Sequence, residues 1–161
     1  MRIIFKMKNI RVGVIGLGVG IKHFNVLNKI KFCSIIAVCD FNKKKLNSLK
    51  LKNSEIIKTT NYKDLLKMKL DLVIIASYDN FHSKQIIEFV KNGSHIFIEK
   101  PMCLNKKEFK NIKNALEKHP KIKFSSNFVL RTKKTLKFLK RIIERKKMGK
   151  LYYLEGDYNL E

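Results

Sequence analysis

Three closely spaced glycines, Gly16, Gly18 and Gly20, are the residues whose type and spacing most clearly indicate ligand chemistry. They follow a short apolar run and precede an amphipathic segment, as expected where a strand leads into a helix around a phosphate group. Gly16 suits the tight turn, and Gly18 lets the backbone approach a pyrophosphate closely. The spacing is a variant, because Ile21 stands where the usual third glycine falls. The segment predicts a nucleotide-binding loop.

An acidic residue stands where such a loop needs one. Asp40 follows the second apolar run, 24 residues after Gly16, and a carboxylate at that place accepts hydrogen bonds from the hydroxyls of an adenosine ribose. Its charge repels a 2′-phosphate and favours NAD over NADP, whereas Lys43, Lys44 and Lys45 could hold that phosphate. A second interpretation remains open, in which Asp40 only caps the following helix.

The triplet Glu99, Lys100 and Pro101 follows the fifth apolar run, at the edge where open α/β sheets bind ligands. Proline restricts the residue before it to an extended conformation, so the Lys100 ammonium can be aimed. Such a lysine can hydrogen-bond a substrate hydroxyl, stabilise charge developing on its oxygen, or transfer a proton. From the triplet alone, an exposed surface lysine is the simpler interpretation.

Small and polar residues also follow the fourth apolar run, at Ala76, Ser77, Asn80 and His82. They could line the nicotinamide side of a cofactor. His82 falls in the first turn of a predicted helix, where the positive end of the helix dipole disfavours protonation. A histidine at that place could equally lie on the surface.

The formal charge of +23 raises the question of nucleic-acid binding. Of the 36 basic residues, 31 are lysines, and they are dispersed along the whole chain. Surfaces that read nucleic acid are usually led by arginine, so we expect no nucleic-acid partner. The surplus charge should instead aid solubility and attract anionic ligands.

The remaining composition describes a globular protein, with 45% hydrophobic and 30% charged residues. No apolar run approaches the length of a membrane span, and residues 1–8 do not resemble a signal peptide, so we expect a cytoplasmic protein without a membrane partner. The spacing of Cys33, Cys39 and Cys103 indicates neither disulfides nor zinc, and we expect buried, reduced thiols. The four histidines share no ligand spacing either, so no metal site is predicted.

The elements that must position these residues alternate regularly between apolar runs and helical periods. This succession of βαβ units predicts an α/β fold with a doubly wound, mostly parallel sheet. Strands are predicted at residues 10–15, 34–39, 55–57, 72–76, 95–98 and 122–125, and helices at residues 19–30, 42–49, 61–68, 80–91 and 106–118.

The rest of the chain has a different pattern. Leu136, Leu139, Ile142 and Ile143 have helical spacing among lysines and arginines, which predicts a helix over 132–147. We interpret it as a solvated basic face above an apolar stripe, in preference to a membrane-surface helix. Residues 151–158 are predicted to form a strand. The expected division is an extension at 1–8, a dinucleotide-binding domain at 9–130, and a further segment at 131–161 with a crossover helix and a strand.

Taken together, these segments resemble the Gfo/Idh/MocA family of NAD(P)-dependent oxidoreductases, which includes glucose-fructose oxidoreductase and inositol dehydrogenase. The likeness covers about residues 9–160, and the run that ends in Glu-Lys-Pro is its most specific part. The motifs that carry it are the glycine loop with His23, Asp40, residues 77–82, residues 93–101 and residues 126–131.

The resemblance implies a Rossmann domain and a role for individual residues. Contact with the dinucleotide is implied for Gly16, Leu17, Gly18, Val19, Gly20, Asp40, Ala76, Ser77, Asn80, His82, Glu99, Pro101 and Asn127. Lys100 would touch the reacting carbinol, and Arg131 would lie by the substrate pocket with Asn127. The implied substrates are sugars, cyclitols and sugar derivatives. Tyr78 departs from the family pattern, which commonly has a proline there.

Length is a further departure. Members of the family continue into a second α/β domain that covers the nicotinamide, and residues 151–158 look like the first strand of its sheet. The resemblance therefore implies the cofactor-binding half of such an enzyme, truncated before the second domain and weakly active or inactive alone. An unpaired strand at this end would expose an apolar edge and could join copies into a homo-oligomer.

Two other classes of function remain open. A transferase that uses S-adenosylmethionine also has a glycine-rich nucleotide loop, although an acidic residue normally precedes it where this chain has Val14 and Ile15. A non-catalytic basic module would bind polyanions without nucleotide preference and with steep salt dependence.

Overall fold

The computed structural model describes residues 9–49 and 55–157, and the chain forms two compact units, Met1–Asn127 and Phe128–Glu161. The predicted N-terminal extension at 1–8 lies outside the described residues, as does Tyr158 at the end of the last predicted strand. The two units are described separately below.

The first unit is built on a six-stranded sheet in which every neighbouring pair is parallel. The strand order is β3-β2-β1-β4-β5-β6, so the chain moves outward from β1 to one edge and then from β4 to the other. The strands are β1 (Ile10–Ile15), β2 (Cys33–Cys39), β3 (Ile57–Thr59), β4 (Leu72–Ile75), β5 (His95–Ile98) and β6 (Phe124–Ser126). This is a doubly wound Rossmann sheet, and it confirms the predicted fold class.

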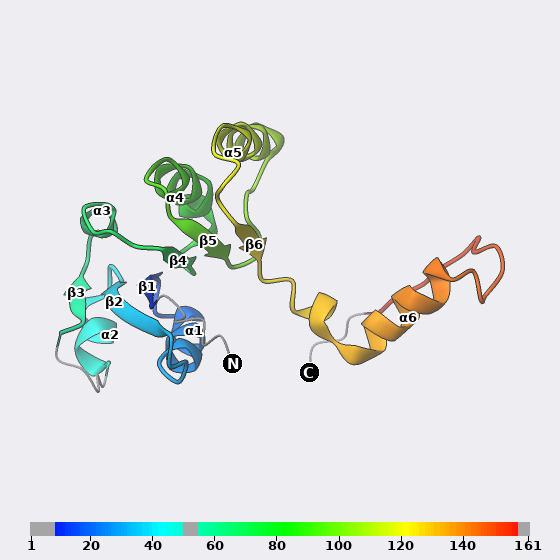
Figure 1. Ribbon diagram of the computed structural model, residues 1–161, viewed down its shortest axis with the longest axis horizontal. Helices are drawn as coiled ribbons and strands as arrows, with labels where there is room; N and C mark the ends of the chain where they lie inside the picture. The colour runs from blue at the N-terminus through cyan, green and yellow to red at the C-terminus, as the bar shows by residue number, and fades with distance from the viewer. Residues whose placement is uncertain (1–8, 50–54, 158–161) are drawn as a thin grey trace, which may run out of the picture. The chain divides into compact units, whose positions relative to one another are not determined.

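Helices cover both faces of this sheet, with α1 and α2 on one side and α3, α4 and α5 on the other (Figure 1). Two of them begin at asparagines that cap the helix: Asn42 accepts from the backbone N–H groups of Lys44 and Lys45, and Asn105 accepts from that of Glu108. The helices are α1 (Gly20–Leu27), α2 (Lys43–Ser48), α3 (Lys63–Leu66), α4 (Asp79–Lys91) and α5 (Lys106–Lys118).

Most element bounds agree with the prediction, and α5 agrees at both ends. The clearest difference is β3, which was expected at 55–57 and lies at Ile57–Thr59. Its bounds follow from its partner, because Ala37 of β2 aligns with Ile57 and Cys39 with Thr59. A three-residue strand is defined by the ladder it joins more than by its own sequence.

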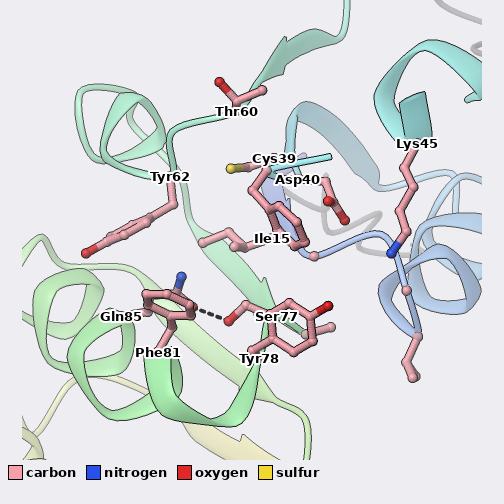
Figure 2. A pocket seen from close by; sticks show the side chains of 15 residues that line it. Ile15, Cys39, Asp40, Lys45, Thr60, Tyr62, Ser77, Tyr78, Phe81 and Gln85 are labelled. Carbon is pink, nitrogen blue, oxygen red and sulfur yellow. Dashed lines mark hydrogen bonds between the residues drawn. The ribbon is translucent and has the colours of Figure 1, made fainter. Parts of the chain in front are cut away.

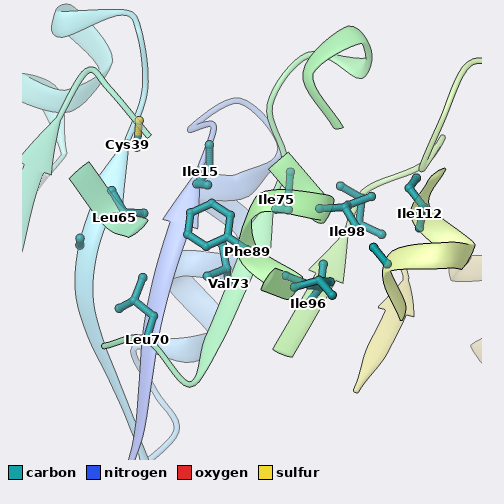
Figure 3. Packing of buried hydrophobic residues seen from close by; sticks show 14 residues of the cluster. Ile15, Cys39, Leu65, Leu70, Val73, Ile75, Phe89, Ile96, Ile98 and Ile112 are labelled. Carbon is teal, nitrogen blue, oxygen red and sulfur yellow. The ribbon is translucent and has the colours of Figure 1, made fainter. Parts of the chain in front are cut away.

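Two apolar clusters lie on the two faces of the sheet. On one face Ile75 and Ile98 pack with Phe89 of α4 and Ile112 of α5 (Figure 3). On the other face, strand residues including Val14 pack with side chains from α1 and α2. Because the sheet is covered on both faces, the sequences of its central strands are continuous apolar runs without polar alternation.

Among its described residues, the second unit contains a short 3₁₀ turn, Val129–Thr132, and one helix, α6 (Lys134–Glu144). The helix is shorter than the predicted 132–147, and none of its residues is buried. Within the described residues 151–157 no strand forms, so the strand predicted at 151–158 is wrong there. A strand needs a neighbour for its backbone hydrogen bonds, and the sequence of the segment by itself does not supply one. The edge through which copies were expected to associate is therefore not formed in these residues.

No helix among the described residues has both the length and the apolar character that crossing a membrane would require.

Candidate functional site

A cavity of about 420 Å³ opens where β1, β2 and β4 end, at the carboxyl edge of the sheet (Figure 2). Open α/β sheets bind ligands at this edge, beside the point where the strand order reverses. Six predicted site residues lie in or beside this cavity: Gly16, Gly18, Val19, Asp40, Ala76 and Ser77.

The glycine loop forms the floor of the cavity, and its geometry requires glycine at one position. Gly16 has a φ of +86°, and a Cβ atom there would overlap the carbonyl oxygen of Ala76. Gly18 is exposed, whereas Gly20 is buried as the first residue of α1. No side chain caps this helix at Val19, and uncapped N–H groups in a first helical turn are suitable donors to an anionic ligand.

Asp40 lies directly beside this loop and is only 4% exposed. Its Oδ2 accepts the backbone N–H of Leu17 at 2.7 Å, and its Oδ1 accepts that of Asn42 at 2.8 Å. The carboxylate thus fixes the glycine loop to the end of β2. The cap of α2 is Asn42 and not Asp40, so the interpretation of Asp40 as a simple helix cap is wrong. The ribose contact stays a prediction, and each oxygen retains acceptor capacity for it.

Two aromatic rings to which the sequence analysis gave no role at the site line the same cavity. Phe41 follows Asp40, Tyr78 follows Ser77, and their ring centroids are 5.6 Å apart. Both are more than half exposed, at 64% and 61%. Aromatic residues directly after two predicted site residues are a signal that the sequence offered, since flat aromatic faces suit the stacking of a nucleotide base.

The loop after β4 is held by hydrogen bonds from α4. Ser77 Oγ donates to Oε1 of Gln85 at 2.6 Å, a partner not foreseen from the sequence (Figure 2). His82 is fully buried, which rules out the alternative of a surface histidine. Its Nδ1 lies 2.7 Å from the carbonyl oxygen of Pro101 and its Nε2 lies 3.0 Å from that of Ser77. Asn80 is exposed in the first turn of α4.

His82 therefore links the loop after β4 to the loop after β5, which carries the Glu99-Lys100-Pro101 triplet. Lys100 itself is exposed, as the simpler interpretation expected, and so is free to reach a ligand. Its backbone N–H lies 3.4 Å from Oε2 of Glu99.

Glu99 is the best-connected side chain of the triplet and is 8% exposed. Its Oε1 accepts from Nε2 of His23 at 2.7 Å and from Nδ2 of Asn127 at 2.7 Å. Burial by itself raises the pKa of a carboxyl group, but these hydrogen bonds outweigh burial and hold the pKa of Glu99 below its ordinary value. Glu99 is thus an ionised, well-ordered group at the end of β5.

Arg131, predicted to lie by the substrate pocket, belongs to the second unit. Its guanidinium lies over the ring of Phe128, 5.3 Å from the centroid. Its predicted substrate contact stays a prediction.

The cysteines and histidines do not form a metal site: among residues 9–49 and 55–157 no three His, Cys, Asp or Glu side chains are grouped to hold a metal ion. All three cysteines are free thiols, but only Cys39 is buried, whereas Cys33 and Cys103 were also expected to be. Burial, with Asp40 and Asp64 nearby, raises the pKa of Cys39 to about 12, so this thiol stays protonated and unreactive at neutral pH.

The chain is similar to a known protein family and to curated members of known type. Residues 10–128 match the model of the oxidoreductase family with an NAD-binding Rossmann fold, GFO_IDH_MocA. Among curated proteins, the myo-inositol 2-dehydrogenase of Thermotoga maritima is 31% identical over 149 residues, which are 89% of this chain and 43% of the relative.

The solved structures that this chain resembles also include dehydrogenases. The scyllo-inositol dehydrogenase of Lactobacillus casei with bound NAD(H) and scyllo-inositol has a TM-score of 0.80 at 26% identity, over 88% of this chain and 43% of that one. The WlbA dehydrogenase of Chromobacterium violaceum, in complex with NADH and UDP-GlcNAcA, has a TM-score of 0.82 at 28% identity, over 92% and 43%. The chain spans less than half the length of the relatives it matches.

Proposed function

The chain belongs to the Gfo/Idh/MocA family of NAD-binding oxidoreductases, and on that basis we propose that its first unit binds NAD(H) across the carboxyl edge of the sheet. The observation that carries the proposal is the junction of the glycine loop with Asp40 at one cavity. Membership of an oxidoreductase family speaks against both the S-adenosylmethionine transferase and the basic polyanion-binding module.

Each part of the dinucleotide has a proposed place. The adenosine ribose lies by Asp40, the pyrophosphate lies over Gly18 at the start of α1, and the nicotinamide half extends toward the ends of β4 and β5. Phe41 and Tyr78 are placed to pack against the adenine, since both are exposed in the cavity beside Asp40. The Asp40 carboxylate disfavours a 2′-phosphate, which supports NAD over NADP.

The proposed reaction is oxidation or reduction of one hydroxyl-bearing carbon of a sugar or cyclitol. When bound, the dinucleotide would supply the hydride acceptor for oxidation, as NAD, or the hydride donor for reduction, as NADH. Lys100 is the proposed catalytic residue, because its exposed ammonium follows β5 and can hydrogen-bond the hydroxyl oxygen of that carbon. Ser77, Glu99 and Asn127 are proposed to border the nicotinamide half, and Arg131 to contact substrate.

Turnover needs more than a cofactor and one lysine. Hydride transfer requires a water-poor pocket and a positioned carbon, and the relatives are more than twice as long as the segment matched here. We therefore propose that the 161 residues bind cofactor and have little or no dehydrogenase activity alone. Support for a sugar-like substrate comes from the relatives crystallised with scyllo-inositol and UDP-GlcNAcA.

Calorimetric titration with NADH tests the proposal. We expect saturable binding with a Kd between about 1 µM and 1 mM, and about tenfold weaker binding by Asp40→Asn. Glu117→Gln is the matched control, because Glu117 is exposed on α5 and pairs with Lys113 at the surface. Thermal unfolding of each variant establishes that it is folded. Absence of NADH binding by the folded wild-type chain would refute the proposal.

A further inference from the structure

Three segments far apart in the chain meet at the Glu99 carboxylate. His23 lies in α1, one turn beyond the glycine loop, while Glu99 and Asn127 directly follow β5 and β6. Both His23 and Asn127 donate to the same oxygen, Oε1, at 2.7 Å. The carboxylate therefore ties the helix that begins at the proposed pyrophosphate site to the ends of two strands.

The His23 ring is held in place by its surroundings as well as by Glu99. It makes an edge contact with Phe97 of β5, with ring centroids 5.3 Å apart and an interplanar angle of 69°. Its side chain is 20% exposed and that of Glu99 is 10% exposed. A hydrogen bond between two such shielded groups is stronger than one at the surface, and losing one donor leaves a buried carboxylate poorly satisfied.

The Glu99 side chain also contacts the backbone of the next residue, Lys100. The second carboxylate oxygen, Oε2, faces the backbone N–H of Lys100 at 3.4 Å, and the next residue, Pro101, is bonded through its carbonyl to His82. The backbone that carries the Lys100 ammonium is thus fixed on one side by His82 and on the other by the Glu99 side chain. Only the second of these depends on His23.

The adenosine side of the cavity is fixed by a separate set of contacts. Asp40 binds Leu17 and Asn42, and neither residue takes part in the Glu99 contacts. A dinucleotide laid across a sheet with this strand order has its adenosine half over β1 and β2 and its nicotinamide half over β4 and β5. The two sets of contacts therefore serve different halves of one ligand.

We propose that His23 is a positioning residue for the nicotinamide half of the site, which it orders by holding Glu99 and through it the Lys100 segment. The inference rests on the proposed binding of NAD(H) and deepens it. A residue with this role should affect ligands that have a nicotinamide group and should not affect those that stop at the second ribose.

Two ligands separate these effects: NADH, and ADP-ribose, which lacks only the nicotinamide. We expect His23→Ala to weaken NADH binding about tenfold in calorimetry and to change ADP-ribose binding by less than about twofold, the first being the size expected for one hydrogen bond to a charged group. His23→Gln should restore NADH binding, because its side-chain amide can donate to Glu99 from nearly the same place as Nε2. His119→Ala, at the end of α5, is the control and should change neither affinity.

If the His23 variant fails to fold, Asn127→Ala tests the same role of Glu99, because it removes the other donor to Oε1 of that carboxylate. It should show the same selective loss of NADH affinity. Equal weakening of both ligands in folded variants, or unchanged NADH affinity in His23→Ala, would overturn the role of His23. Failure of the wild-type chain to bind either ligand would refute NAD(H) binding itself, so the two failures are distinguishable.

Discussion

Asp40 and Leu17 are joined by a 2.7 Å hydrogen bond from the backbone N–H of the glycine loop to a buried carboxylate. The residue proposed to select the adenosine ribose therefore also holds the loop proposed to receive the pyrophosphate. Any substitution of Asp40 acts on both, and tests of cofactor preference have to compare two cofactors on one variant.

Cofactor preference should depend on Asp40 and Lys45 in opposite ways. Both line the cavity, and Lys45 Nζ lies 4.0 Å from where a Cβ of Gly18 would stand. Removing the carboxylate with Asp40→Ser should improve NADPH relative to NADH about tenfold, because a 2′-phosphate is no longer repelled and a cation remains close by. The measurement is the ratio of the dissociation constants for NADPH and NADH. Adding Lys45→Met to Asp40→Ser should reverse the relative improvement in NADPH binding. A ratio that stays at the wild-type value in Asp40→Ser would contradict the assigned role.

Gly16→Ala should cost more stability than an otherwise similar change at Gly93. Both glycines have a φ of +86°, but nothing lies within 4 Å of a Cβ at Gly93, whereas a Cβ at Gly16 meets the Ala76 backbone. We expect a loss of about 1–2 kcal/mol for Gly93→Ala from backbone strain alone, and about 2–5 kcal/mol for Gly16→Ala from strain and overlap together. Urea denaturation measures both, and equal losses would show that the loop relaxes around the methyl group.

His82→Leu should destabilise the first unit by about 2–4 kcal/mol, since it removes the buried ring nitrogens that lie at hydrogen-bond distance from the carbonyl oxygens of Ser77 and Pro101, to one of which a neutral imidazole donates. His119→Leu serves as the comparison, because His119 lies at the end of α5 and is only partly buried. Denaturant unfolding monitored by circular dichroism gives both values. A loss as small as that of His119→Leu would mean that water or a shifted loop satisfies the two carbonyls.

Acid should weaken the fold partly through Glu99. Its pKa in the folded chain lies below the ordinary value of 4.5, because hydrogen bonds from His23 and Asn127 outweigh the opposing effect of burial. The ionised form therefore stabilises the native state fully above about pH 4.5, and this contribution is lost as pH falls through the lowered pKa.

The measurement is the free energy of unfolding between about pH 6 and pH 3 for the wild type and Glu99→Gln. The wild-type curve should fall more steeply below pH 4.5 than that of the variant. Asp64 also has a lowered pKa, chiefly through its hydrogen bond with Thr59, and titrates in both proteins, so the difference between the curves isolates Glu99. Parallel curves would contradict the assignment.

Much of this architecture could be predicted from local patterns. Continuous apolar runs indicated strands buried on both faces, the glycines marked the turn between β1 and α1, and Asp40 stood out because it directly follows the second strand. Each of these signals depends on residues within one strand or one turn. The strand predicted at 151–158 failed in its described part, because whether a segment becomes a strand depends on a neighbour that no local pattern supplies.

The sequence by itself determined the succession of elements and the glycine–aspartate signature, since periodicity and turn chemistry act over a few residues. Only the tertiary structure decided that His82 is buried between two carbonyl oxygens and that His23 reaches Glu99, 76 positions along the chain. Such contacts depend on which strands become neighbours, and strand order follows from packing the whole sheet between its two layers of helices.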